Sequence, residues 1–136
     1  MRYFLLICAV VALVGCGESA EHQSAKVIET AIREELKKPK GELTKADLER
    51  VTTLDLDSNQ LTDVTELEKL TQLKMLHLYK NQLTELPKGL EKLTQLTSLY
   101  LNNNQLTEVP KGLEKLPNLE KLNLNGNQLT NVKGLE

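Results

Sequence analysis

Aromatic residues and an excess of charge of one sign are both lacking in this chain of 136 residues. Phe, Tyr and Trp together supply four residues, whereas Leu supplies 29 and Asn 10, an imbalance that indicates one short pattern written several times. The 17 basic and 19 acidic side chains leave a formal net charge of −2, which excludes the clustered basic surface that nucleic-acid binding needs. The length and the 40% hydrophobic content predict one small globular domain, neither disordered nor collagen-like.

A hydrophobic run long enough to cross a membrane is also lacking. The apolar stretch at residues 3–14 has twelve residues, whereas a transmembrane helix needs about 20. It follows Met1-Arg2 and ends in Leu13-Val14-Gly15-Cys16, a layout typical of a cleaved export signal. These last four residues resemble the lipobox of bacterial lipoproteins. The resemblance implies that residues 1–15 are removed as a signal peptide and that Cys16 is lipidated.

Lipidation of Cys16 would place the protein at a membrane, because several acyl chains hold a protein there where one chain binds only marginally. The alternative is that Cys16 is an ordinary thiol of a conventional secreted protein. In either case Cys8 lies in the removed segment, so an intramolecular disulfide is excluded. In lipoproteins an Asp after the Cys favours retention at the inner membrane, and Gly17 stands there instead. The resemblance therefore implies the outer membrane or the cell surface.

Residues 16–23 read as the lipidated Cys and a flexible polar tether, and residues 24–50 as a helical cap. Apolar residues recur at helical spacing from Ser24 to Lys38, where Pro39 and Gly41 end the predicted helix. A capping box, Thr44-Lys45-Ala46-Asp47, then starts a short second helix. The alternative, a helix lying on the membrane surface, is disfavoured by the acidic residues on its polar face.

Residues 51–136 contain four repeats, the last incomplete, which begin at positions 51, 73, 96 and 119. Each follows the pattern L-x-x-L-x-L-x-x-N-x-L, except that Val51 replaces the first Leu. This pattern matches the leucine-rich repeat. We therefore predict an α/β fold, a leucine-rich repeat solenoid with a short curved parallel sheet and an N-terminal helical cap that covers its first coil.

Alternation along each Leu-x-Leu strand predicts leucines inside and the intervening residues outside. The Asn that follows each strand, at Asn59, Asn81, Asn104 and Asn127, should satisfy backbone groups of its own bend and of the neighbouring repeat. Pro87-Lys88-Gly89 and Pro110-Lys111-Gly112 exclude long helices on the return path, where we expect irregular or 3₁₀ turns.

The outward positions form the predicted concave face, on which a protein partner would bind. They are Thr53, Asp55, Asp57, Ser58, Met75, His77, Tyr79, Lys80, Ser98, Tyr100, Asn102, Asn103, Lys121, Asn123, Asn125 and Gly126. A strand spacing of about 4.8 Å brings His77 beside Tyr100, with Tyr79 diagonal to it. We predict a contact patch of Met75, His77, Tyr79, Tyr100, Asn102 and Asn123. The alternative is that the tyrosines only favour the strand and pack sideways along it.

Neither a catalytic site nor a metal site is predicted. Asp55, Asp57 and Asp63 could attract Ca²⁺, but no loop offers the six or more oxygens that this ion prefers, so we expect a solvated acidic corner. An enzyme needs a nucleophile, a base and a pocket, and the histidines are His22 on the tether and His77 on an open sheet. We therefore predict a non-enzymatic protein without a cofactor.

Residues 43–54 resemble the junction between the helical cap and the first repeat of internalins, bacterial surface proteins that bind host receptors through a leucine-rich concave face. The resemblance covers residues 24–136 and implies a protein-binding module. The chain departs from internalins in its 23-residue repeats with Leu-Pro-Lys-Gly-Leu and in ending at Glu136 without an immunoglobulin-like domain. A particular receptor therefore does not carry over.

The sequence leaves two functions open. One is a membrane-anchored module that binds a protein at the bacterial envelope through its concave face, and the other is a structural or spacer lipoprotein without a specific ligand. In the last repeat, Val132 and Leu135 begin a return path that nothing covers. Self-association through this edge, a partner, and a truncated gene product are the three explanations that remain.

Overall fold

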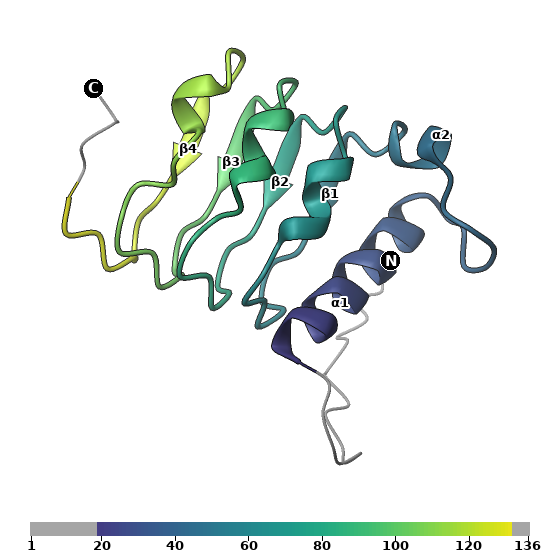
Figure 1. The fold of residues 1–136 in the computed structure, drawn as a ribbon, viewed down its shortest axis with the longest axis horizontal. Helices are drawn as coiled ribbons and strands as arrows, with labels where there is room; N and C mark the ends of the chain where they lie inside the picture. Colours follow the sequence, from purple (N-terminus) through teal and green to yellow (C-terminus); the bar gives the residue numbers. More distant parts are fainter. Residues whose placement is uncertain (1–18, 132–136) are drawn as a thin grey trace, which may run out of the picture.

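The computed structural model describes residues 19–131, and the predicted signal peptide, Cys16 and residues 132–136 lie outside this range (Figure 1). Within the described part, helices at the N-terminal end precede short strands that alternate with 3₁₀-helices. The elements are α1 (Ala20–Glu35), α2 (Lys45–Leu48), β1 (Thr53–Asp55), η1 (Thr65–Lys69), β2 (Met75–His77), η2 (Lys88–Lys92), β3 (Ser98–Tyr100), η3 (Leu113–Lys115) and β4 (Lys121–Asn123).

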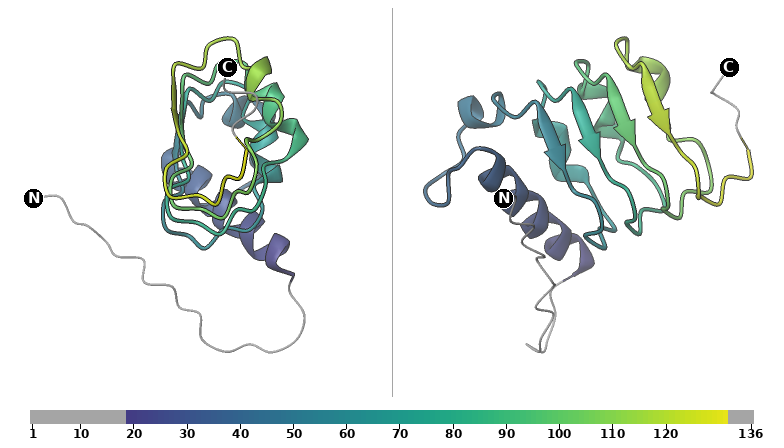
Figure 2. Two further views of the ribbon diagram at one scale, coloured as in Figure 1. Left: turned by 90° about the vertical axis from the view of Figure 1, so that its left-hand side faces the viewer. Right: turned by 180° about the vertical axis from the view of Figure 1, so that it is seen from behind.

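The strands form one parallel sheet in the order β1-β2-β3-β4. Their central leucines are in register, since Leu54 pairs with Leu76, Leu76 with Leu99, and Leu99 with Leu122. Seen along the axis of the solenoid, successive coils superimpose, with the strands on one side and the 3₁₀-helices on the other (Figure 2). This arrangement confirms the predicted leucine-rich solenoid with its concave sheet.

The core consists of aliphatic side chains stacked coil upon coil. In β1, β2 and β3 and just beyond them, the inward leucines are at most 2% exposed: Leu54, Leu56, Leu76, Leu78, Leu99 and Leu101. Leu122 and Leu124 are only partly buried, because β4 is the last strand of the described sheet. Each coil therefore relies on both neighbours for its cover.

The asparagine ladder is present between the coils. Asn81 accepts from the backbone N–H of Leu61 at 2.9 Å and donates to the carbonyl oxygens of Leu56 and Leu78 at 2.9 and 3.1 Å. Asn104 and Asn127 repeat this pattern one and two coils later. Asn59 differs, because α1 and not a coil precedes it: its exposed amide donates only to the carbonyl of Asp57, at 3.1 Å.

The convex side is made of 3₁₀ turns, as the Pro-Lys-Gly segments predict. Ion pairs connect these turns from coil to coil, since Lys92 reaches Glu68 at 3.0 Å and Lys115 reaches Glu91 at 2.5 Å. Gly112 is the N-cap residue of η3 and has a φ of 94°, a left-handed conformation that favours glycine. The return path is thus short enough to keep the repeat at 22 or 23 residues.

The helical cap closes the β1 end of the sheet, where α1 lies against the first coil (Figure 1). Ile28 and Ile32 are 1% and 5% exposed and join the leucine core. Ser24 is buried as well, and its hydroxyl accepts from the backbone N–H of Thr62 at 3.3 Å. Between residues 19 and 131, none of the helices combines the length and apolar character that crossing a membrane requires.

The helix α1 begins at Ala20, so the prediction of a flexible tether is wrong for residues 20–23. The physical reason is an N-terminal cap: the Ser19 hydroxyl accepts from the backbone N–H of His22 at 3.3 Å. Glu21 lies in the first turn, where its negative charge favours the helix dipole. The helix also ends at Glu35, three residues before the predicted end, because Lys37 adopts a left-handed φ of 53°.

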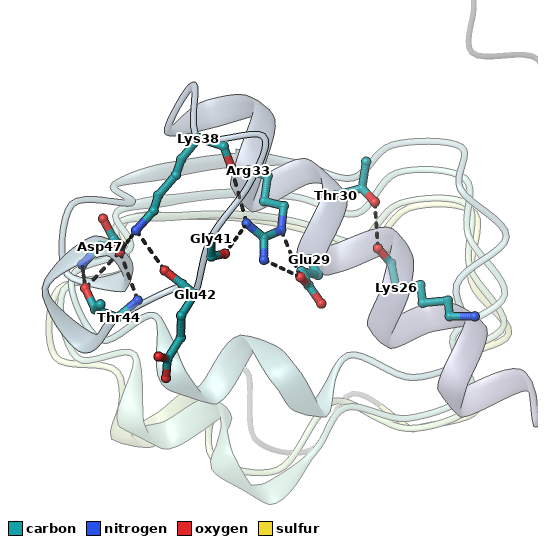
Figure 3. A network of polar contacts seen from close by, with 9 residues as sticks. All are labelled: Lys26, Glu29, Thr30, Arg33, Lys38, Gly41, Glu42, Thr44 and Asp47. Carbon is teal, nitrogen blue, oxygen red and sulfur yellow. Dashed lines mark hydrogen bonds and ion pairs between the residues drawn. The ribbon is translucent and has the colours of Figure 1, made fainter.

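A polar network joins α1 to α2 and fixes the loop between them (Figure 3). Arg33 pairs with Glu29 at 2.7 Å and donates to the carbonyl of Gly41 at 3.0 Å. Lys38 pairs with Asp47 at 2.6 Å, and the predicted capping box between Thr44 and Asp47 is complete. The hydrogen bond from Lys38 and those from the backbone and hydroxyl of Thr44 hold the pKa of Asp47 well below its usual range.

Candidate binding surface

The outward residues of the sheet form two parallel rows. The strand row is Asp55, His77, Tyr100 and Asn123, which pair in register across the sheet. The bend row is Asp57, Tyr79, Asn102 and Asn125, two positions further along each coil and therefore on the same face by alternation. Along each row the side chains change from carboxylate through aromatic to amide.

His77 and Tyr100 meet at the centre of the strand row, as the strand spacing predicts. Their rings are stacked, with 4.7 Å between centroids and 26° between planes. Tyr79 lies in the bend row beyond His77 and is half-buried, as is Tyr100. Both tyrosines keep part of their surface open, and the aliphatic core contains no aromatic residue within the described range. The face thus holds a compact aromatic patch.

Asp57 stands beside this patch. Its Oδ1 accepts from the backbone N–H of Tyr79 at 2.7 Å, and its Oδ2 lies 4.0 Å from Nδ1 of His77. Burial raises the pKa of Asp57; the hydrogen bond from Tyr79 lowers it, the charge of Asp55 raises it and His77 lowers it. The net effect is a raised pKa of Asp57, because the desolvation of its charged form outweighs the hydrogen bond from Tyr79.

The remaining predicted contact residues also lie on the sheet face. Met75 is half-buried at the start of β2, and Asn102 and Asn123 are half-buried toward the β4 end. The prediction for Ser98 was wrong, because this residue was expected to face solvent and is only 5% exposed. It stands in register between Met75 and Lys121, and both of these side chains are longer than that of Ser98.

The structure does not bring the three candidate Ca²⁺ ligands together. Asp63 turns to its own bend, where its carboxylate accepts from the hydroxyl of Thr65 at 2.8 Å. Across the described part of the chain, no group of three or more His, Cys, Asp or Glu side chains could hold a metal ion. Asp55 and Asp57 remain together on the concave face.

An open cavity of about 330 Å³ lies away from the sheet face, between the start of α1 and two adjacent bends. Sequence reasoning missed it because it depends on where α1 begins. Three threonines and three carboxylates line most of it. The lining residues are Ala20, Glu21, Thr62, Asp63, Thr65, Thr84, Glu85 and Pro87. None of these side chains is a His or Cys that could serve as a strong base or nucleophile at neutral pH.

Comparisons with known proteins agree with this architecture. A family model described as leucine rich repeat matches residues 71–129, and another for two copies of the repeat matches residues 49–92. No curated protein shows significant similarity to the chain.

Several solved structures of bacterial proteins are similar to the chain. The internalin InlF of Listeria monocytogenes has 30% identity and a TM-score of 0.71, over 78% of this chain and 31% of that one. The functional domain of InlJ from the same species, which includes a cysteine ladder, has 34% identity and a TM-score of 0.59, over 66% and 19%. The protein LIC12759 of Leptospira interrogans, a leucine-rich repeat protein, has 37% identity and a TM-score of 0.61, over 65% and 23%. The chain thus spans less than a third of the length of each.

Proposed function

Because this chain belongs to the leucine-rich repeat family, we propose that it is a protein-binding module of the bacterial envelope that holds its partner on the concave sheet face. The observation that carries the proposal is the position of the aromatic residues. Tyr79 and Tyr100 lie on the outward face, half-buried and next to Met75 and His77, although an aliphatic core is available to bury them.

An aromatic patch of this kind suits recognition. Tyrosine offers a large contact area with few rotatable bonds, so little conformational entropy is lost when a partner orders it. The stack of His77 on Tyr100 restricts both rings before binding, which lowers that cost further. Below the patch, the leucines of the parallel sheet hold the strands in register and keep the surface rigid. The partner would meet a preformed surface.

The proposal includes a location. The lipobox-like Leu13-Val14-Gly15-Cys16 supports export and lipidation at Cys16, and Gly17 supports transfer to the outer membrane or the cell surface. On that basis residues 1–15 are the signal peptide and the cap begins a few residues after the lipid. The similarity to an internalin supports the protein-binding part of the proposal.

Site-specific photocrosslinking tests where the partner lies. A photoreactive phenylalanine analogue replaces Tyr100 on the concave face or, as the matched control, Glu114 on the convex turn η3. Both proteins are expressed in the native host and irradiated in intact cells. We expect a discrete protein adduct from position 100 at a yield about tenfold above that from position 114.

The other open function, a spacer lipoprotein without a specific ligand, predicts a different result. A spacer would give diffuse crosslinks of equal yield from both positions, because no partner would prefer one face. Equal yields, or a discrete adduct from position 114 alone, would therefore contradict binding on the concave face. Membrane fractionation of the same cells tests the anchor separately.

A further inference from the structure

The repeats provide an internal comparison for the two carboxylates of the first coil. The Oδ1 of Asp55 accepts from the backbone N–H of Asp57 at 3.0 Å. In the fourth coil the Oδ1 of Asn123 accepts from the backbone N–H of Asn125 at 3.1 Å, in the same row and with the same spacing. An amide therefore makes this bond as well as a carboxylate does. The negative charge of Asp55 is not needed for the bend.

The same reasoning applies to Asp57. Its structural bond is the one from the backbone N–H of Tyr79, at 2.7 Å, and an amide oxygen could accept it equally. Burial raises the pKa of this carboxyl, so keeping it charged costs free energy. No Lys or Arg of the described range forms an ion pair with Asp55 or Asp57, and Nδ1 of His77 lies 4.0 Å from Oδ2 of Asp57. Within the described residues, neither carboxylate therefore has a permanently charged cation as its partner.

On these grounds we propose that the concave face recognises an arginine side chain of its protein partner, seated beside Asp55 and Asp57 and next to Tyr79 and the stacked pair of His77 and Tyr100. The inference rests on the proposed function and adds the chemical character of the partner. A guanidinium group can interact with both the carboxylates and the aromatic rings of this surface. Its planar fork of donors pairs with carboxylates, and its flat face stacks on aromatic rings.

The opposite end of the concave face differs in charge, so the surface is electrostatically asymmetric from β1 to β4. Asn123 and Asn125 occupy the positions of Asp55 and Asp57, and Lys121 starts β4 with an exposed side chain. Three strand spacings separate β1 from β4, about 14 Å. An arginine is therefore attracted to the β1 end and repelled from the β4 end. The partner is expected to bind in one orientation only.

A small probe tests the preference without knowledge of the partner. The ¹⁵N-labelled full chain, in detergent micelles, is titrated with the capped tripeptide Gly-Arg-Gly and with the same peptide carrying citrulline, which has the shape of arginine but no charge. Backbone amide shifts are followed for Asp57, His77, Tyr79 and Tyr100. We expect the arginine peptide to bind at least about fivefold tighter than the citrulline peptide, with shifts centred on these residues.

The variant Asp55→Asn/Asp57→Asn removes the charges and keeps both hydrogen-bond acceptors. It should bind the two peptides equally, whereas the control Asp63→Asn, which neutralises a carboxylate off the sheet face, should keep the preference. The comparison of the arginine and citrulline peptides on the wild-type protein is informative even if the double variant fails to fold.

Equal binding of the two peptides by the wild-type protein, or no shifts at the sheet residues, would overturn the arginine inference. Either result leaves the concave face as a protein-binding surface, which the crosslinking yield tests independently. If the crosslinking yields were equal but the arginine preference remained, the surface would bind arginine and the proposal of a protein partner on the concave face would be wrong. The two failures are thus distinguishable.

Discussion

The imidazole of His77 lies stacked on the phenol ring of Tyr100, with 4.7 Å between the ring centroids. The pair joins β2 to β3 on the outward side of the sheet. A stacked pair of this kind contributes about 0.5–1.5 kcal/mol to stability beyond the area it buries. The two residues can therefore serve both the sheet and a partner, and experiments must separate the two roles.

The double variant Tyr79→Ala/Tyr100→Ala should separate them. We expect the free energy of unfolding to fall by about 1–2 kcal/mol, because neither ring belongs to the leucine core. The affinity for a partner identified by crosslinking should fall at least about tenfold, since interface tyrosines near a contact centre carry much of the binding energy. Urea unfolding and surface plasmon resonance measure the two quantities. The control Tyr79→Phe/Tyr100→Phe keeps the rings, and unchanged affinity in the alanine variant would refute the patch.

The loss in the free energy of unfolding caused by removing a ladder asparagine should depend strongly on which coil the asparagine belongs to. Asn104→Ala removes three hydrogen bonds at a residue that is 6% exposed and leaves the backbone N–H of Leu83 without its acceptor. We expect a loss of about 2–4 kcal/mol in the free energy of unfolding. Asn59→Ala, at the exposed first position, should cost no more than about 0.5 kcal/mol. Similar losses for both variants in urea unfolding would mean that the ladder is not the cause.

The parts of the fold that repeat were predictable from the sequence. Four copies of one pattern fix which leucines point inward, because each copy constrains the register of the next. The strand register places His77 beside Tyr100, and the structure confirms this neighbour relationship. The difference between Asn59 and its three counterparts was not predicted, because it depends on which element precedes the first coil.

The parts that do not repeat were predicted less well. Apolar periodicity begins at Ser24, whereas the first turn of α1 is polar and is set by the cap at Ser19. The burial of Ser98 was not predicted, because alternation along a strand considers the direction of a side chain and not its size relative to its neighbours Met75 and Lys121. The sequence shows that residue 57 is acidic but does not show its hydrogen-bond partners. That the structural role of Asp57 does not require its charge could therefore be inferred only from the structure.

Gly89 in η2 provides a test of the convex packing. A Cβ at this position would lie 2.9 Å from the Cβ of Glu68 and would displace that side chain from its 3.0 Å ion pair with Lys92. Gly89→Ala should therefore lower the free energy of unfolding by about 1 kcal/mol. In the background of Glu68→Gly, which removes the Cβ at position 68 as well, the same change should be neutral or stabilising by about 0.4–1 kcal/mol, because alanine restricts the unfolded chain. An equal loss in both backgrounds, measured by urea unfolding, would exclude the steric explanation.

The Asp47 carboxylate should make the cap sensitive to acid. Its pKa is lowered in the folded protein by Lys38 first and by the two groups of Thr44, so its contribution to stability is present above about pH 4 and is lost as the pH falls below that value. We compare the Tm of the wild type with that of Asp47→Asn between pH 7 and pH 2. The wild type should melt higher at pH 7, and the difference should shrink steadily below pH 4. A difference that stays constant over this range would contradict the linkage.

Cys16 is the residue on which the proposed location depends. Metabolic labelling with a palmitate analogue should mark the wild-type protein and leave Cys16→Ser unmarked, since serine offers no thiol for acylation. Several acyl chains at about 0.8 kcal/mol per buried methylene hold a protein on the membrane, so the wild type should sediment with it, whereas a Cys16→Ser chain from which residues 1–15 have been removed should not. Because an uncleaved apolar segment could also retain the variant, mass spectrometry must establish whether residues 1–15 are removed. Cys8→Ser is the matched control, and labelling that follows Cys8 and not Cys16 would refute the anchor.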